Sequence, residues 1–152
     1  MNSKKQITLL LGIFLSMALY SQESIKIEAE SLNSKSEKIS ISKKKTGETT
    51  IGGGFASKGW IKFDDVDFGE GKGQLKIRAA SGSKSKKASL EVRLNSPDGE
   101  LIGKIKVPVK GWDSFNEADA VLARKISSTA DICIVSTSGG VILDWIEFTK
   151  YN

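Results

Sequence analysis

Apolar and polar residues alternate with period two in several short stretches of the chain. The alternation is clearest at residues 25–30, 75–80 and 90–95, where aliphatic residues are separated mostly by charged or polar ones. Successive side chains of a β-strand point to opposite faces of its sheet, so each stretch is predicted to form a strand with one face in a core. No stretch after residue 22 keeps the spacing of three and four residues that an amphipathic helix requires. The pattern therefore predicts an all-β domain.

Turn-forming residues separate these stretches from further candidate strands. The further candidates are Lys38–Ser42, Gly59–Val66, Glu100–Val107, Ala118–Lys125, Asp131–Thr137 and Val141–Thr149. The segment Ser96-Pro97-Asp98-Gly99 has the residue order of a tight reverse turn, so residues 90–107 are predicted to form a hairpin. Glycine-rich segments at 52–54, 69–73 and 138–140 indicate loops. Roughly nine short strands with turns at this spacing predict a two-sheet β-sandwich of jelly-roll type.

The first 21 residues have the layout of a secretory signal peptide. Lys4 and Lys5 precede an uncharged apolar run over residues 7–18. This run is shorter than the ~20 apolar residues that span a bilayer, so no membrane span is predicted. The alternative, a buried N-terminal helix, has no obvious partner in the strand-like chain that follows. We therefore expect a signal peptide at 1–21 and one secreted domain, extracellular or periplasmic, at 22–152.

Charge and cysteine content narrow the class of protein further. The net charge of +5 falls to +3 when Lys4 and Lys5 leave with the signal. A nucleic-acid-binding domain would carry a strong basic stripe, so no nucleic-acid partner is expected. Cys133 is the only cysteine and cannot form an internal disulfide. Its apolar neighbours indicate a buried structural thiol.

The residues available for catalysis are few. The chain has no histidine and no Gly-x-Ser-x-Gly motif, which excludes histidine-based mechanisms. Asp64, Asp65 and Asp67 cluster near a strand end and leave a carboxylate-pair glycosidase formally open. A solvated acidic turn explains this cluster more simply, so we expect no enzymatic activity.

Three carboxylates form a candidate metal site. Glu28 and Glu30 lie two residues apart in a predicted strand, and Asp144 interrupts the apolar run at 141–146. First and last strands of a sandwich often pair, and an unpaired buried aspartate would be costly, so these groups are candidate ligands of one hard cation such as calcium. The equally weighted alternative is that both glutamates face water and Asp144 pairs with a lysine or with backbone N–H groups.

Aromatic residues near turns form a candidate sugar site. Trp112 follows Gly111 in a loop-like stretch, Asn116 comes shortly after, and Phe55 follows three glycines. A flat ring can stack on the C–H face of a pyranose while amides and carboxylates bind its hydroxyl groups. The alternative is that these rings belong to the core, which is the interpretation we adopt for Trp60 and Trp145.

Two basic segments, at residues 43–45 and 83–87, are candidates for contact with an anionic polymer. Segments of this kind are more often solvated surface, and both interpretations stay open at this point.

The order and spacing of several short segments resemble family 6 carbohydrate-binding modules, the β-sandwich units attached to secreted polysaccharide-degrading enzymes. These segments are Ile27–Glu30, Gly59–Phe63, Val66–Gly69, Leu90–Leu94, Ser96–Gly99, Leu101–Gly103, Gly111–Trp112 and Leu143–Phe148. The resemblance implies a structural calcium ion held by Glu28, Glu30 and Asp144. It also implies a polysaccharide or oligosaccharide bound between two rings, with Trp112 as one ring and Phe55 as the only candidate for the other.

The resemblance departs from the family pattern at Ile142, which stands where the family usually has an asparagine that binds the ligand. The alternative function is therefore a secreted sandwich that has lost sugar binding and acts as a structural or protein-interaction unit. In the leading interpretation the partners are a glycan and, through it, polysaccharide-degrading enzymes.

Overall fold

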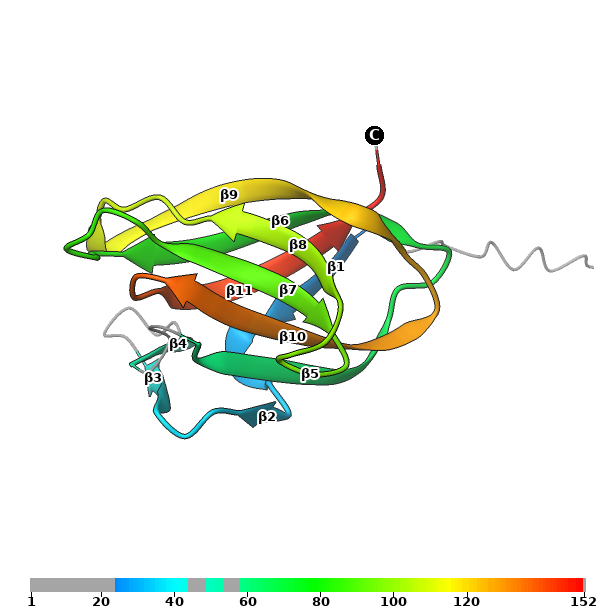
Figure 1. Cartoon of the computed structure of the whole chain (residues 1–152), viewed down its shortest axis with the longest axis horizontal. Helices are drawn as coiled ribbons and strands as arrows, with labels where there is room; N and C mark the ends of the chain where they lie inside the picture. The colour runs from blue at the N-terminus through cyan, green and yellow to red at the C-terminus, as the bar shows by residue number, and fades with distance from the viewer. Residues whose placement is uncertain (1–23, 44–48, 54–57, 152) are drawn as a thin grey trace, which may run out of the picture.

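The computed structural model describes residues 24–43, 49–53 and 58–151. These residues form two antiparallel sheets packed face to face, with a single 3-10 turn, η1 (Ala29–Ser31), among them (Figure 1). One sheet contains β1 (Ser24–Glu28), β3 (Ile39–Lys43), β4 (Thr49–Gly53), β6 (Lys72–Ser81), β9 (Gly111–Ile126) and β11 (Ile142–Thr149). The other contains β2 (Ser34–Lys35), β5 (Trp60–Asp67), β7 (Ser89–Leu94), β8 (Leu101–Lys106) and β10 (Thr129–Ser138). The predicted all-β two-sheet sandwich is confirmed.

The core lies between the sheets and is filled by alternate residues of each strand. In β11, Leu143, Ile146 and Phe148 are fully buried. The rings of Phe68 and Phe148 meet edge to face, with centroids 5.1 Å apart, the geometry that the charge distribution of aromatic rings favours. The core consists mainly of inward apolar positions of the strands, as the alternation predicts. Among the described residues, no helix is long and apolar enough to cross a membrane.

Two predicted pairings agree with the structure. The strands β7 and β8 form the hairpin expected around the turn at 96–99, with Leu90 opposite Ile105. The strands β1 and β11 lie side by side and antiparallel, with Glu28 opposite Trp145. The second pairing brings the first and last strands together, as the candidate metal site requires.

The structure corrects two predictions about strands and adds one strand that was not predicted. The strand β9 begins at Gly111, whereas the sequence predicted a start at residue 118. The prediction missed this start because the inward positions Asn116, Ala118 and Ala120 show no alternation of large apolar residues. Glycines predicted as a loop at 52–54 contribute Gly52 and Gly53 to β4, which pairs with β3. The two-residue strand β2 was not predicted, because it is too short to show a period.

Two tryptophans predicted in the core lie outside it. Trp60 and Trp145 are only partly buried, on the outer faces of the two sheets. Lys26 lies over the ring of Trp145, with its Nζ atom 4.7 Å from the ring centroid, which is a favourable cation–π contact. An aromatic residue in a strand thus packs under a long charged side chain rather than in the core.

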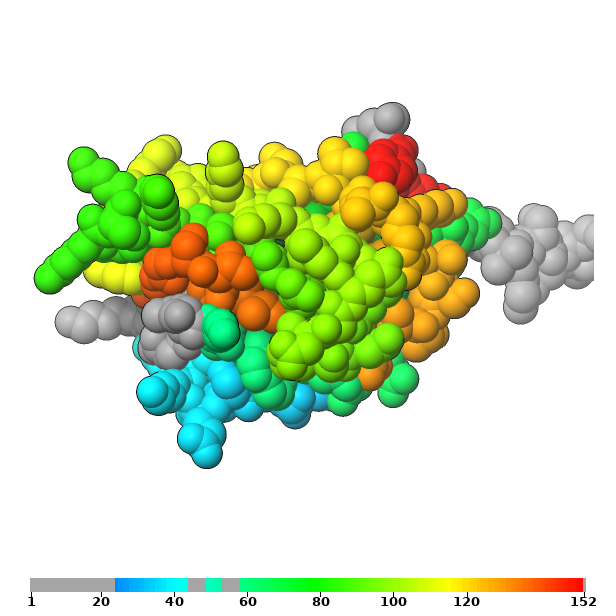
Figure 2. All heavy atoms as spheres, in the orientation of Figure 1, coloured from blue at the N-terminus to red at the C-terminus, as the bar shows by residue number. Residues whose placement is uncertain are grey.

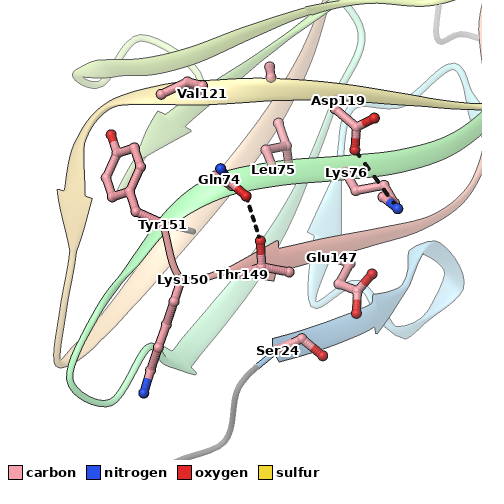
Figure 3. Close-up of a pocket in the computed structure, with 11 residues that line it drawn as sticks. Ser24, Gln74, Leu75, Lys76, Asp119, Val121, Glu147, Thr149, Lys150 and Tyr151 are labelled. Atoms are coloured by element: carbon pink, nitrogen blue, oxygen red, sulfur yellow. Dashed lines mark hydrogen bonds and ion pairs between the residues drawn. The ribbon is translucent and has the colours of Figure 1, made fainter.

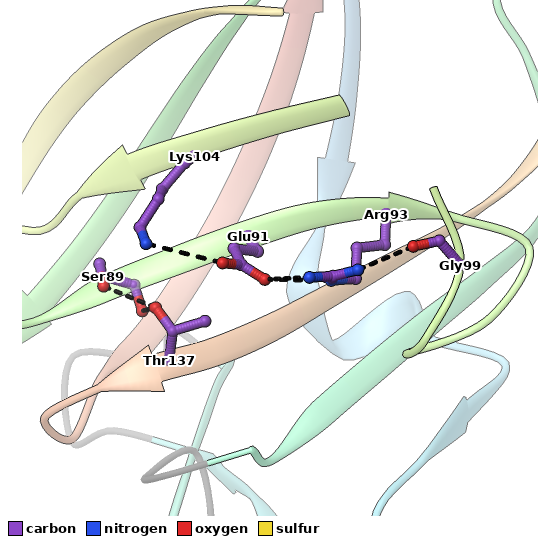
Figure 4. Close-up of polar contacts among 6 residues, drawn as sticks. All are labelled: Ser89, Glu91, Arg93, Gly99, Lys104 and Thr137. Carbon is purple, nitrogen blue, oxygen red and sulfur yellow. Dashed lines mark hydrogen bonds and ion pairs between the residues drawn. The ribbon is translucent and has the colours of Figure 1, made fainter. Parts of the chain in front are cut away.

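A polar network covers the outer face of the sheet that contains β7 and β10 (Figure 4). Glu91 accepts hydrogen bonds from the Nε and Nη2 atoms of Arg93, at 3.0 and 2.8 Å, and Lys104 lies 3.6 Å from its other oxygen. Arg93 also donates to the carbonyl of Gly99 at 2.8 Å. Cys133 is fully buried on this sheet, as predicted, and burial raises the pKa of its thiol to about 11. The thiol is therefore inert.

Three loops gather at one end of the sandwich. They join β6 to β7, β8 to β9 and β10 to β11, at the left of Figure 1, whereas the start of β1 and the C-terminus lie towards the right. This loop end holds Trp112, the first residue of the candidate sugar site.

Candidate functional site

Trp112 is the second residue of β9 and is held at the surface by an irregular entry into the strand. It follows Gly111, whose φ of 123° is a conformation that residues with a Cβ rarely adopt. The register between β6 and β9 shifts between Ala79 and Ser81, opposite this entry. The indole is 46% exposed, so a large part of the ring is accessible to a ligand.

Two glycines form the base on which the indole rests. A Cβ added at Gly82 would lie 2.5, 2.6 and 2.7 Å from the Nε1, Cδ1 and Cε2 atoms of Trp112. Nearly equal distances to three consecutive ring atoms place Gly82 over the face of the five-membered ring rather than at its edge. A Cβ added at Gly140 would lie 2.7 Å from Cη2 and farther from both neighbouring ring atoms, which is an approach to the edge. The ring position therefore depends on the absence of side chains at both residues.

Hydrogen bonds connect the loops that carry these glycines. The hydroxyl of Ser81 donates to the carbonyl of Gly140 at 2.6 Å, and the amide of Ser83 donates to the Ser81 hydroxyl at 3.3 Å. The amide of Lys86 donates to the carbonyl of Ser83 at 3.0 Å and closes a turn. The base of the indole is thus a connected structure of two loops, which favours a preorganised platform.

The other two predicted sugar-site residues differ in outcome. Asn116 lies in β9, four residues after Trp112, and its amide nitrogen donates to the carbonyl and hydroxyl oxygens of Ser114 at 2.7 and 3.3 Å. Its donor is therefore already used within the strand. Phe55 lies outside the described residues. Ile142, at the start of β11, is partly buried.

The three predicted metal ligands line one cavity of about 380 Å³, together with Lys26, Thr49, Arg78 and Trp145. Asp144 is nearly buried and forms an ion pair with Arg78, a partner that the sequence did not predict. Glu28 lies 3.4 Å from Lys26 and is half exposed. Glu30 was expected in the same strand as Glu28, but β1 ends at Glu28 and Glu30 lies in η1.

One atom of this cavity has no hydrogen-bond partner among the described residues. The Oε2 atom of Glu30 is buried and accepts no hydrogen bond from the described residues. An unsatisfied buried carboxylate oxygen is costly, and an all-oxygen set of Glu28, Glu30 and Asp144 is the donor type that calcium prefers. The donor chemistry therefore fits a hard cation. The side chains are not gathered as ligands, since no three acidic, histidine or cysteine residues of the described part converge on one point.

A larger cavity of about 930 Å³ lies elsewhere, across β6, β9 and β11 on the outer face of their sheet (Figure 3). Its polar groups are largely satisfied by one another. Gln74 accepts from Thr149 at 3.4 Å, and Lys76 lies 4.0 Å from Asp119. The half-exposed ring of Tyr151 uses its hydroxyl to donate to the carbonyl of Leu122 at 3.1 Å. We therefore place the candidate site at Trp112 rather than at this larger cavity.

A two-sheet sandwich that presents an exposed indole on a glycine base at its loop end defines a β-sandwich binding module. The model of the family "Carbohydrate binding module (family 6)" matches residues 28–150. The chain belongs to this family, and the resemblance seen in the sequence is confirmed.

Relatives of known structure or activity agree with this assignment. The chain is 31% identical over 108 residues to the endo-1,4-beta-xylanase A of Thermoclostridium stercorarium. The aligned region covers 66% of this chain and 20% of that enzyme. The chain thus spans about a fifth of the length of this curated relative. A family 6 module from Clostridium stercorarium in complex with cellobiose superposes with a TM-score of 0.76 at 28% identity, over 84% of this chain and 94% of that one. A family 6 module from Clostridium cellulolyticum in complex with xylose gives a TM-score of 0.74 at 26% identity, over 83% and 97%.

Proposed function

We propose that this chain is a non-catalytic module that binds a polysaccharide or oligosaccharide by stacking a sugar ring on Trp112. The observation that carries the proposal is the half-exposed indole supported by Gly82 and Gly140. Membership of the family and the cellobiose and xylose complexes of its relatives support carbohydrate as the ligand class. One stacked ring with a few hydrogen bonds that compete with water corresponds to a Kd of about 1 μM to 1 mM.

The test is glycan binding by the Trp112→Ala variant. We expect the substitution to weaken binding about tenfold or more, which corresponds to about 1.4 kcal/mol. Isothermal titration with cello- and xylo-oligosaccharides measures this loss. Tyr151→Ala is a matched control, because Tyr151 is another half-exposed ring that rests on a glycine, Gly73.

The two variants separate the possible explanations. A module that uses Trp112 loses affinity in Trp112→Ala and keeps it in Tyr151→Ala. Unchanged binding by Trp112→Ala would show that the sugar site does not include Trp112. If the unmodified chain binds no glycan in a broad screen, the result favours the alternative, a sandwich that has lost sugar binding. The internal bonding of Asn116 and the apolar Ile142 favour that alternative.

We further propose that the module holds a structural calcium ion through Glu28, Glu30 and Asp144. The unpartnered oxygen of Glu30 and the shared cavity support this proposal. When bound, the ion would join η1 to β11 by neutralising their carboxylates. A cation that binds only the folded state stabilises it by RT ln(1 + c/Kd), where c is the concentration of free cation, so stability rises with that concentration. The melting temperature should therefore fall on addition of chelator and return with excess calcium, and the Glu30→Gln variant should not respond.

Secretion, the signal peptide at 1–21 and action alongside polysaccharide-degrading enzymes complete the proposal. N-terminal sequencing of the protein recovered from the periplasm or medium measures the first two. An increase in the rate of hydrolysis of an insoluble polysaccharide by a separate enzyme, lost in Trp112→Ala, measures the third.

A further inference from the structure

Exposed lysines surround the glycine base of Trp112. Lys84, Lys86 and Lys87 lie in the β6–β7 loop directly after Gly82, and all three are exposed. Lys110 is exposed immediately before Gly111, at the entry to β9. Figure 2 shows side chains of the β6–β7 loop, in green, extending from the loop end of the molecule.

Contacts within the loop end hold the backbone of the 83–87 loop against the β10–β11 loop, which carries Gly140 of the glycine base. The carbonyl of Lys87 lies where a Cβ of Gly139 would clash, at 2.0 Å, so the β6–β7 and β10–β11 loops are in close contact. The hydroxyls of Ser83 and Ser85 are 2.9 Å apart, and Ser85 donates to the Lys87 carbonyl at 3.4 Å. The backbone of the basic loop is thus bonded to itself and to the base of the platform, while its ammonium groups face solvent.

A fifth lysine joins this group from the other sheet. The amide of Lys58 donates to the carbonyl of Ser136 at 2.7 Å, and the hydroxyl of Ser136 bonds to the carbonyl of Gly139 at 3.3 Å. Lys58 is exposed. It therefore belongs to the same loop end, next to the β10–β11 loop.

The lysines of this loop end have no anionic partner among the described residues, whereas several cations on the sheets have one. Across the sheets, Lys26, Lys62, Lys76 and other cations form ion pairs with carboxylates. None of the five loop-end lysines forms an ion pair within the described ranges 24–43, 49–53 and 58–151. Asp113 is the acidic residue next to Trp112. Among the described residues of this loop end, five lysines thus accompany one aspartate, and their charge is available to a ligand.

We propose that the Trp112 site takes an anionic glycan, whose carboxylate or sulfate groups bind to the lysines of the 83–87 loop while a sugar ring stacks on the indole. The inference rests on the proposed function, because Trp112 must be a sugar platform for the lysines to act on a bound glycan. Carboxylate and sulfate share the chemistry that ammonium groups bind, a localised negative charge on oxygen atoms. The lysines select among glycans, and the ring holds the chain in place.

The experiment compares glycans that differ only in charge. The probes are oligogalacturonate against its neutral methyl ester, and a sulfated galactan fragment against its desulfated form, each titrated into the whole chain. The pair with the larger preference identifies uronate or sulfate as the recognised group. The triple variant Lys84→Gln, Lys86→Gln, Lys87→Gln is compared with Lys35→Gln, Lys38→Gln, Lys125→Gln, which removes the same charge from exposed positions elsewhere.

We expect the acidic member of one pair to bind at least tenfold more tightly than its neutral form at about 0.01 M salt, where the Debye length is about 30 Å. The loop triple variant should lose about tenfold, and the loss should shrink near 0.15 M salt, where this length is about 8 Å. The control triple variant should lose much less. Trp112→Ala should weaken binding of the acidic and neutral members alike.

Three results would overturn the inference in distinguishable ways. Equal binding of charged and neutral forms, with no effect of the loop triple variant, removes the anionic specificity and leaves the proposed function intact. Equal losses in both triple variants, with Trp112→Ala unchanged, indicate polyelectrolyte attraction without a site. Absence of binding to every probe and to neutral oligosaccharides removes the proposed function together with the inference.

Discussion

The base under the indole gives the sharpest prediction, because it changes the site without touching the ring. In Gly82→Ala, the new Cβ would lie 2.5 Å from the Nε1 atom of Trp112. Non-bonded heavy atoms are most stable about 3.5 to 4.0 Å apart, so the indole must move by about 1 Å. The ring is half exposed and can tilt towards solvent, so we expect the fold to tolerate the change. The tilted ring no longer has the position in which it stacks on a sugar.

The expected loss of affinity follows from the exposed area of the ring. A tryptophan presents about 250 Å², and 46% of the residue is exposed, which leaves about 115 Å² for contact at most. A sugar that covers half of this area buries roughly 60 Å², worth about 1.5 kcal/mol at about 25 cal/mol per Å². This is about tenfold in Kd. A tilted ring should lose most of it, so we expect a five- to tenfold weakening, on the order of 1 kcal/mol.

Stability should change little in the same variant. A Gly→Ala substitution lowers the entropy of the unfolded chain and stabilises by about 0.4 to 1 kcal/mol where the backbone permits it. Gly82 does not need the left-handed conformation that Gly111 adopts. This gain offsets part of the cost of moving Trp112, and the melting temperature should stay within a few degrees of the unmodified chain, since about 1 kcal/mol shifts it by roughly 2 to 8 °C.

The assay is isothermal titration with the best-binding glycan, alongside a thermal melt. Gly73→Ala is the control, because its Cβ would lie 2.0 Å from the Cε2 atom of Tyr151 and would displace a ring of similar exposure elsewhere. Wild-type affinity in Gly82→Ala, with a glycan that Trp112→Ala no longer binds, would refute the requirement for a ring seated on Gly82. Equal weakening in Gly73→Ala would show that the loss is not local.

Two further predictions concern stability. Glu91→Gln should destabilise the fold by about 1 to 3 kcal/mol, measured by urea unfolding, because it weakens the charge-assisted bonds of a nearly buried carboxylate to Arg93; a change below about 0.5 kcal/mol would contradict this role. The hydrogen bond from Lys62 lowers the pKa of Asp131 below its ordinary value of 3.8, and Arg124 likewise lowers the pKa of Glu100. The unfolded chain therefore takes up these protons first, so stability should fall as the pH drops below about 4, and Asp131→Asn should flatten that fall. A melting temperature that declines equally in the variant would disprove the assignment to Asp131.

The sequence predicts the fold where each strand buries one row of aliphatic residues. The hairpin of β7 and β8 combines such alternation with a Pro-Asp-Gly turn, and both signals are local. The strand β9 escapes prediction at its start because Asn116, Ala118 and Ala120 replace large apolar residues at inward positions. Trp145 was misplaced because the sequence does not reveal that Lys26, on the neighbouring strand, covers its ring.

The candidate site could be predicted only in part, for the same reason. A tryptophan after a glycine in a polar stretch indicates Trp112, but the residues that hold its ring, Gly82 and Gly140, lie 30 and 28 positions away in the sequence. No local pattern links them. Asp144 was recognised as an unusual charge in an apolar strand, yet its ion pair with Arg78 depends on the pairing of β6 with β11.

The pairing of β1 with β11 also decides how the module can be joined to other proteins. Ser24 lies opposite Thr149, so the two ends of the described domain leave the sandwich together, at the end away from Trp112. A fluorescent protein or a hydrolase fused to either end would enter at this point and leave the loop end facing outward. Both orientations of such a fusion should therefore bind a surface equally well, which makes the module suitable as an interchangeable unit in engineered polysaccharide probes.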